Sequence, residues 1–253
     1  MKFTCAPTEN MEPLLDLWQE AFGESKEEAL PFFQEIFPLC RPFRALEGDS
    51  LCAMAYALPQ TLDWEGNSLP VAYIYAVATK KERRGQGLAR RLLDFLGETL
   101  KAEGCKGLLL VPAGEDLFQF YEKLGFSVFC HRKPEKLHAA SGELAPCGEK
   151  EYLLKRAALL GEIPHNTPPL QVLKHLECYL WDGGCAAGEM TPEGFVFREV
   201  LGDTAPAGVI VKAADQGHAH ALLFGEKGDT PYAVAKALWE DFPETGYFSF
   251  AMD

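Results

Sequence analysis

The feature that most constrains this 253-residue chain is a glycine-containing turn between a strand-like run and an amphipathic helix. The turn reads Arg84-Gly85-Gln86-Gly87-Leu88-Ala89. Small residues let the backbone approach a ligand, and the free N–H groups of a first helical turn point at bound oxygens. The helix dipole adds about half a positive charge at the same place. The turn therefore predicts a site for an anion such as a pyrophosphate.

Basic residues crowd this turn in an otherwise acidic chain. They are Lys80, Lys81, Arg83, Arg84, Arg90 and Arg91, whereas the whole chain has a formal net charge of -13. A local basic turn indicates a phosphate-bearing ligand rather than a nucleic-acid surface. A dinucleotide fingerprint would need glycine where Arg90 stands, and a P-loop would need a Gly-Lys-Ser/Thr ending, which is missing. Neither NAD nor ATP is favoured.

Two short motifs resemble the signatures of the GNAT superfamily of N-acetyltransferases. Arg84, Gly87 and Ala89 fill the three places of Arg/Gln-x-x-Gly-x-Gly/Ala. Downstream, an apolar run over 106–111 fits a buried parallel strand, and a helix is expected over 115–123. The second signature is then matched by the motif Phe120-Tyr121-Glu122-Lys123-Leu124-Gly125-Phe126. The resemblance covers residues 1 to about 132 and implies an α/β fold of the α+β kind, a mixed GNAT sheet with splayed central strands.

Hydrophobic spacing predicts the elements around the turn. We expect a helix over 11–22, a second helix opened by a capping box of Ser25 and Glu28, and a meander of strands over 43–47, 51–62 and 69–78. In the resembled fold the first two helices flank the acceptor cleft. Their aromatic residues are core, or alternatively a substrate wall; those to inspect are Trp18, Phe22, Phe32 and Phe33.

The resemblance implies acetyl-CoA as cosubstrate and assigns its contacts by position. The last strand of the meander should splay from the strand at 108–111, and the pantetheine arm would lie against the backbones of Val77 and Thr79. The turn would hold the pyrophosphate. The cofactor-binding residues predicted in this way are Val77, Ala78, Thr79, Arg84, Gly85, Gln86, Gly87, Leu88 and Ala89.

The resemblance also suggests one catalytic residue. Tyr121 would protonate the departing thiolate, since a phenol has a pKa near 10; the alternative is that it only packs under its helix. Backbone N–H near Val77 would stabilise the oxyanion. Some relatives carry a Glu on the fourth strand, where residues 73–76 offer no carboxylate, and Gly114 replaces an Asn. A water relay, Glu115, Asp116 or the second domain could supply the base.

Composition excludes several other classes of protein. No apolar run reaches eighteen residues and no signal peptide opens the chain, so we expect no membrane partner and a cytoplasmic location. The eight cysteines show no Cys-x-x-Cys pair, which indicates reduced thiols and no metal site. His218 and His220 are read as surface residues rather than metal ligands.

The length predicts a second, smaller α/β domain. We expect a GNAT domain over 1–135, a linker over 136–150 and a degenerate GNAT-like domain over 151–253. Its predicted elements are helices over 151–160, 170–181 and 232–241, a hairpin of strands over 184–188 and 194–201, and further strands over 208–212, 219–224 and 246–252. Asp253 is a further candidate for the catalytic base, or else is merely packed.

The leading hypothesis is an acetyl-CoA-dependent N-acetyltransferase acting on a primary amine of a small molecule or peptide by direct attack in a ternary complex. The excess of acidic residues suggests a cationic acceptor, or alternatively serves only solubility. Two rivals remain open, a non-catalytic acyl-CoA-binding sensor or interaction module, and an interaction scaffold without CoA. A homodimer is also left open.

Overall fold

The computed structural model describes residues 1–8, 10–138, 145–191, 194–202, 218–223 and 230–251. The chain divides into two compact units, and each unit combines distant parts of the sequence. Unit 1 consists of Met1–Thr61, Leu69–Ser127 and Val234–Phe242; unit 2 consists of Leu62–Ser68, Val128–Ala233 and Pro243–Asp253. The predicted strand over 208–212 and Asp253 lie outside the described residues.

The sheet of unit 1 is mixed, as the sequence predicts. Its strands in spatial order are β1 (Lys2–Thr4), β2 (Arg41–Glu47), β3 (Ser50–Trp64), β4 (Asn67–Thr79), β5 (Gly107–Leu110) and the second half of β13 (Thr230–Ala237). β2 pairs antiparallel with β3, β4 pairs parallel with β5, and β5 pairs antiparallel with β13. The predicted meander and the predicted buried strand after it are both confirmed.

The predicted splay between β4 and β5 is present. Their parallel pairing begins at Val71↔Gly107 and ends at Tyr73↔Leu109, although β4 continues to Thr79. Ala76 lies beyond that point with a φ of 50°, a left-handed conformation that non-glycine residues seldom adopt. A strand with one such residue turns its peptide groups out of the regular ladder. The end of β4 therefore has backbone groups that do not pair with β5.

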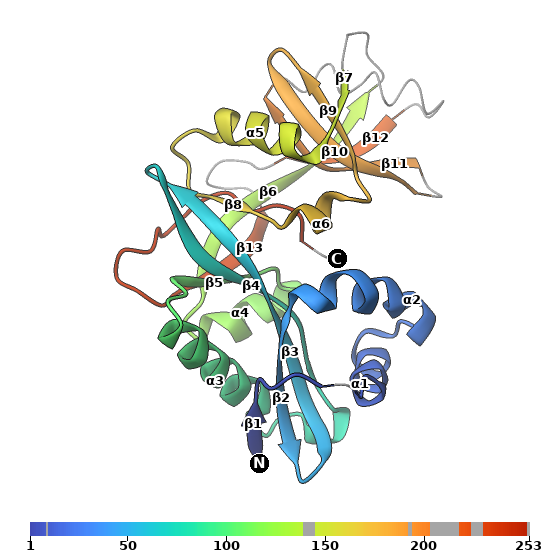
Figure 1. Ribbon diagram of the computed structural model, residues 1–253, viewed down its shortest axis with the longest axis vertical. Helices are drawn as coiled ribbons and strands as arrows, with labels where there is room; N and C mark the ends of the chain where they lie inside the picture. Colours follow the sequence, from blue (N-terminus) through green and yellow to red (C-terminus); the bar gives the residue numbers. More distant parts are fainter. Residues whose placement is uncertain (9, 139–144, 192–193, 203–217, 224–229, 252–253) are drawn as a thin grey trace. The chain divides into compact units, whose positions relative to one another are not determined.

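Helices cover both faces of this sheet. One face is covered by α3 (Leu88–Ala102). The opposite side of the strands carries α1 (Glu12–Phe22), α2 (Lys26–Pro31), the π-helix η1 (Phe32–Ile36) and the 3-10 turn η2 (Phe37–Leu39) (Figure 1). The capping box of Ser25 and Glu28 is formed as predicted. The leucines of α3 face the core as expected: Leu88, Leu92, Leu96 and Leu100 are buried. The remaining elements of this unit are the 3-10 turn η3 (Lys81–Arg83) and α4 (Glu115–Glu122).

Unit 2 is a second sheet with one long helix packed on it. Its neighbouring strands are β6 (Ser127–His138), β12 (His218–Leu223), β11 (Gly194–Gly202), β10 (Gly184–Thr191), β9 (Glu177–Trp181) and β7 (Ala145–Cys147). The helix is α5 (Glu149–Leu160), and the short elements are β8 (His165–Thr167) and α6 (Leu170–Leu173). The predicted helix over 151–160 and hairpin of β10 and β11 are confirmed, and β12 corresponds to the strand predicted over 219–224.

Three predicted elements of the C-terminal half are wrong. The helix over 232–241 is instead strand β13, because residues 232–235 are all buried, as in a strand covered on both faces. The helix over 170–181 shrinks to α6, and its second half becomes β9, which forms a hairpin with β10.

The strand predicted over 246–252 is also absent from the described residues of that segment, which form only a bridge between Tyr247 and His165. The side chain of Asn166 replaces a strand partner, since it accepts a hydrogen bond from Ser249 N–H at 3.1 Å and donates one to Ser249 O at 3.1 Å. Phe250 then has a φ of 59°. Backbone hydrogen bonds hold the segment at Gly246 and Tyr247, and beyond them the side chain of Asn166 takes the place of a strand partner.

Arg156 is the centre of a buried polar network in unit 2. Its side chain is 1 % exposed, and its Nε lies 3.1 Å from each carboxylate oxygen of Glu199, which is fully buried. The other guanidinium nitrogens donate to Asn166 O at 2.6 Å and Ser249 Oγ at 3.0 Å. Tyr247 Oη donates to the same carboxylate at 2.7 Å. A buried charge needs such partners, and here they join α5, β11 and the C-terminal segment.

Candidate acyl-CoA site

Two left-handed glycines shape the turn between β4 and α3. Gly85 has a φ of 74°, and Gly87, the N-cap of α3, has a φ of 69°. A Cβ added at either position would meet no atom within 4 Å. Glycine is therefore favoured here by the backbone conformation and not by crowding. The space beside both glycines is open for a ligand.

The N-terminus of α3 has no side-chain cap. The first hydrogen bond inside the helix runs from Arg91 N–H to Gly87 O at 3.1 Å. The N–H groups of the preceding first turn have no acceptor within the helix, and they carry the positive end of its dipole. This end of the fifteen-residue helix can therefore receive an anion.

A cavity of about 360 Å³ lies at this helix start. Its lining residues are Thr79, Arg83, Arg84, Gly85, Gly87, Leu88, Ala89, Arg90 and Phe120. Six of the residues predicted to bind the cofactor are among them: Thr79, Arg84, Gly85, Gly87, Leu88 and Ala89. This basic cavity is thus formed by the end of β4, the turn, the start of α3 and one residue of α4.

The arginines of the cavity are held by backbone oxygens. Arg84 Nε donates to Thr79 O at 3.1 Å, and Arg90 Nη2 donates to Lys123 O at 2.5 Å. A carbonyl oxygen fixes a guanidinium without neutralising it, so the positive charge of both residues is available to a ligand. Arg83 differs, because it forms an ion pair with Glu47.

The remaining three residues predicted to bind the cofactor do not line this cavity. Ala78 is 5 % exposed and packs in a core cluster with Trp18. Gln86 Nε2 donates to Glu82 O at 3.4 Å, and Val77 is half-buried on β4. The roles predicted for Val77 and Ala78 use the backbone, and β4 at this point has already left the ladder with β5. Those roles stay predictions.

Tyr121 lies on α4 directly after Phe120, which lines the cavity. Its ring centroid is 5.1 Å from that of Phe120 and 5.6 Å from that of Phe126, and the residue is 7 % exposed. Burial raises the pKa of the Tyr121 phenol to about 12, because the charged form loses hydration. The phenol therefore keeps its proton throughout the ordinary pH range. Glu115 and Asp116, two candidate bases, are exposed in the first turn of α4.

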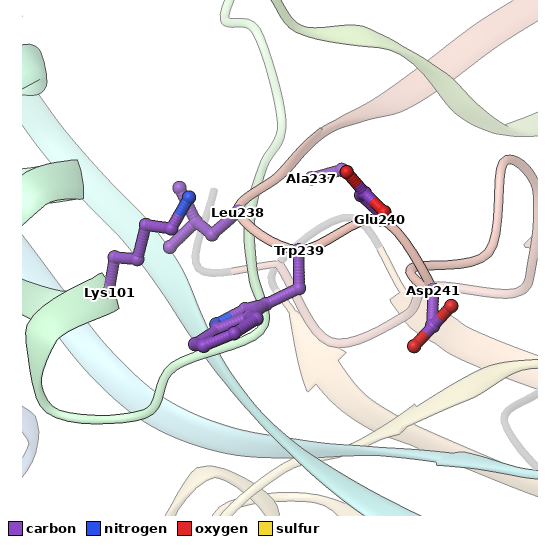
Figure 2. A pocket seen from close by; sticks show the side chains of 6 residues that line it. All are labelled: Lys101, Ala237, Leu238, Trp239, Glu240 and Asp241. Atoms are coloured by element: carbon purple, nitrogen blue, oxygen red, sulfur yellow. The ribbon is translucent and has the colours of Figure 1, made fainter.

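A second cavity lies at the other end of α3 and was not foreseen from the sequence. It measures about 630 Å³ and is lined by Lys101, Ala237, Leu238, Trp239, Glu240 and Asp241 (Figure 2). Trp239 is 44 % exposed; its Nε1 donates to Cys105 O at 3.0 Å, and Lys106 Nζ lies 3.9 Å from its ring centroid. At 1.5 Å per residue, α3 separates the two cavities by roughly 20 Å. The sequence does not predict this cavity, because the pattern of residues 232–241 favours a helix there.

Residues 4–129 match the family model described as an acetyltransferase (GNAT) domain. The chain belongs to the GNAT superfamily. The matched segment includes the whole turn and Tyr121, and both lie in the acetyltransferase domain of this GNAT protein. A sequence search of the curated proteins finds no match.

Solved structures share the fold of this GNAT chain at low sequence identity. A conserved protein of unknown function from Enterococcus faecalis superposes with a TM-score of 0.75 at 14 % identity, covering 94 % of this chain and 72 % of its own. A GCN5-related N-acetyltransferase from Kribbella flavida gives 0.70 at 17 %, covering 93 % and 70 %. One from Anabaena variabilis gives 0.70 at 16 %, covering 94 % and 73 %. The similarity extends beyond the GNAT domain to nearly the whole chain.

Two features are absent from the residues that the structure describes. None of the helices there is both long and apolar enough to cross a membrane. No group of three or more His, Cys, Asp or Glu side chains in the same ranges is placed to hold a metal ion.

Proposed function

We propose that this protein is an acetyl-CoA-dependent N-acetyltransferase that acts on a primary amine in a ternary complex. The observation that carries the proposal is the basic cavity at the uncapped start of α3. Pyrophosphate oxygens would accept hydrogen bonds from the first-turn N–H groups, and Arg84 and Arg90 would add charge. The pantetheine arm would extend along the backbone of Val77 and Thr79, where β4 has parted from β5.

In this proposal the chemistry is one acyl transfer. The neutral amine nitrogen attacks the thioester carbonyl carbon, the new C–N bond forms, and backbone N–H near Val77 stabilises the oxyanion. The C–S bond then breaks, and the thiolate takes the proton of Tyr121. The nitrogen loses its extra proton to water, and Tyr121 is reprotonated from solvent. A pKa of about 12 keeps the phenol protonated before the transfer, and it also makes Tyr121 a weaker proton donor than an exposed tyrosine.

The test is the release of CoA thiol from acetyl-CoA in the presence of a panel of primary amines. Tyr121→Phe should leave acetyl-CoA binding intact and slow turnover by about 10- to 1000-fold, since it removes only the proton donor. Phe126→Leu, which alters the ring packed against Tyr121, is the control for packing. Equal turnover of Tyr121→Phe and the unaltered protein would exclude the acid role.

One observation favours a second function, that of an acyl-CoA-binding sensor without catalysis. Residues 73–76 of β4 carry no carboxylate where a base is expected. A sensor would bind acetyl-CoA in calorimetry and release no thiol with any amine. An interaction scaffold without CoA would show no binding at all.

The division of labour along the chain is likewise a proposal. We assign cofactor binding and catalysis to residues 1–135, a connecting role to 136–150 and a degenerate GNAT-like domain to 151–253, although β6 and β7 extend into the connecting stretch and residues 234–242 belong to unit 1. The last of these would help to shape the acceptor site or form an interface between copies of the chain. A size measurement in solution would reveal a homodimer.

A further inference from the structure

Aromatic rings gather on one face of the unit 1 sheet, around Trp18 of α1. The ring centroids of Phe32, Phe22, Phe33, Tyr75 and Tyr56 lie 4.8, 5.1, 5.3, 5.9 and 6.4 Å from that of Trp18. We call these six residues the aromatic wall. They come from α1, η1, β3 and β4, so four elements that are separate in sequence contribute to one cluster.

The aromatic wall packs directly on the end of β4. Ala76 and Ala78 belong to the same core cluster as Trp18, and Tyr75 packs against that cluster. Val77, proposed above to hold the cofactor arm, lies between these two alanines. A group resting on the wall would therefore be next to the strand segment where the thioester is proposed to lie.

Only three of the six rings of the wall are buried in the hydrophobic core. Trp18, Phe33 and Tyr56 are 3 %, 8 % and 0 % exposed. Phe22 is 42 % exposed, and Phe32 and Tyr75 are half-buried. The three buried rings belong to the hydrophobic core. The other three rings leave part of their aromatic surface uncovered by the rest of the unit.

The backbone that carries Phe32 is unusual. Residues Phe32–Ile36 form a π-helix, a rare geometry that occurs often at functional sites. Its first two residues both contact Trp18, and Phe32 also lies 5.3 Å from Tyr75 between ring centroids. The wide turn thus directs adjacent side chains to one cluster.

Two carboxylates border the wall. Glu24 Oε2 accepts a hydrogen bond from Trp18 Nε1 at 2.8 Å, which fixes the indole. Glu20 accepts one from the backbone N–H of Lys81, which ties α1 to the connection after β4. These two carboxylates offer acceptors to an approaching ammonium ion, while the rings favour the neutral amine once it is bound.

Resting on the proposed function, we infer that the acceptor is a primary amine that carries an aromatic or similarly flat apolar group. That group packs on Phe22, Phe32 and Tyr75, and the amine points toward the thioester beside Val77. By removing water around the nitrogen, the wall lowers the pKa of the bound ammonium group and so favours the neutral amine, which a general base would otherwise have to produce. Phe22 and Phe32 are therefore specificity-determining residues.

The test compares two amines that differ only in the ring, and adds a ring-free diamine as a third. With acetyl-CoA held constant, kcat/KM from CoA release is measured for 2-phenylethylamine, ethylamine and the ring-free dication putrescine. We expect 2-phenylethylamine to exceed ethylamine by at least about 30-fold, because only the ring can bury apolar surface against the wall. Phe32→Ala should lower kcat/KM for 2-phenylethylamine about 10-fold and leave that for ethylamine unchanged, and Phe22→Leu should act in the same direction.

Phe95→Leu is the matched control, since Phe95 is half-buried on α3 and contacts Phe3 and Phe43 outside the wall. It should leave the ratio unchanged, and all variants should bind acetyl-CoA with the same affinity. A ratio near one, a preference for putrescine, or an equal loss for both amines in Phe32→Ala would overturn the inference and leave the proposed function standing. Failure to release thiol with any amine would instead overturn the proposed function.

Discussion

Two arginine sites, one in each unit, hold their positive charge in different ways. In unit 1, Arg84 and Arg90 bond to carbonyl oxygens at the edge of an open cavity. In unit 2, Arg156 is buried, and its nitrogens are satisfied by Glu199, Asn166 and Ser249. A charge that is fixed but not neutralised can bind a ligand, whereas one that is fully neutralised can only hold the fold together. The comparison separates residues that should affect affinity from residues that should affect stability.

The largest expected effect is on the buried side of this comparison. Arg156→Met should lower the free energy of unfolding by about 3–5 kcal/mol, because Glu199 is left buried without its partner. Chemical denaturation with the fluorescence of the four tryptophans as probe would measure it. The double variant Arg156→Met with Glu199→Leu should recover part of the loss. A double variant that is less stable than the single one would show that the ion pair is not the source.

Gly87→Glu should have the next largest effect, on acetyl-CoA affinity. The carboxylate would stand at the positive end of α3 and repel the pyrophosphate, so the affinity should fall at least about 100-fold in calorimetry. Gly87→Ala separates backbone from charge and should lose much less. Gly66→Glu, at another exposed glycine of positive φ, should bind normally. Normal binding by Gly87→Glu would place the cofactor elsewhere.

Arg84→Gln should weaken acetyl-CoA binding about 10-fold, or about 1.4 kcal/mol, through the loss of one charged contact to phosphate. Its stability should stay within about 0.5 kcal/mol of the unaltered protein, as for most surface substitutions. Arg198→Gln, which breaks an ion pair with Glu189 in unit 2, should not change the affinity. A large loss of stability in Arg84→Gln would contradict the division between binding and structural arginines.

The smallest expected effect is that of Gly85→Ala. A residue with a Cβ pays about 1 kcal/mol for a φ of 74°, and here the methyl group meets no neighbour, so strain is the whole cost. Thermal unfolding would show a fall of a few degrees. An unchanged transition would mean that the turn relaxes to another conformation.

The turn and the elements around it could be predicted because their signals are local. Glycines, a leucine stripe and a capping box each act within a few residues, and the structure forms all three. The buried network could not be predicted in the same way. Arg156 and Glu199 are distant in sequence, and each of them alone resembles an ordinary surface residue.

The errors in the C-terminal half have a similar cause. Residues 232–241 carry an alanine-rich pattern that suits a helix in isolation, but the pairing of β13 with β5 overrides that preference. The aromatic wall lies between these cases. Trp18, Phe22, Phe32 and Phe33 were singled out from the sequence, whereas the contributions of Tyr56 and Tyr75 depend on the tertiary fold.

Strand β13 limits where the polypeptide can be truncated. Its second half, Val234–Ala237, belongs to the same unit as the cavity at the start of α3 and completes the sheet beside β5. A fragment ending at residue 135 would contain both family signatures and still lack this strand. The apolar edge formed by Leu108, Leu109 and Leu110 would then be unpaired, and such an edge is a template for aggregation. An insoluble N-terminal fragment would therefore report a missing strand and not a failed cofactor site.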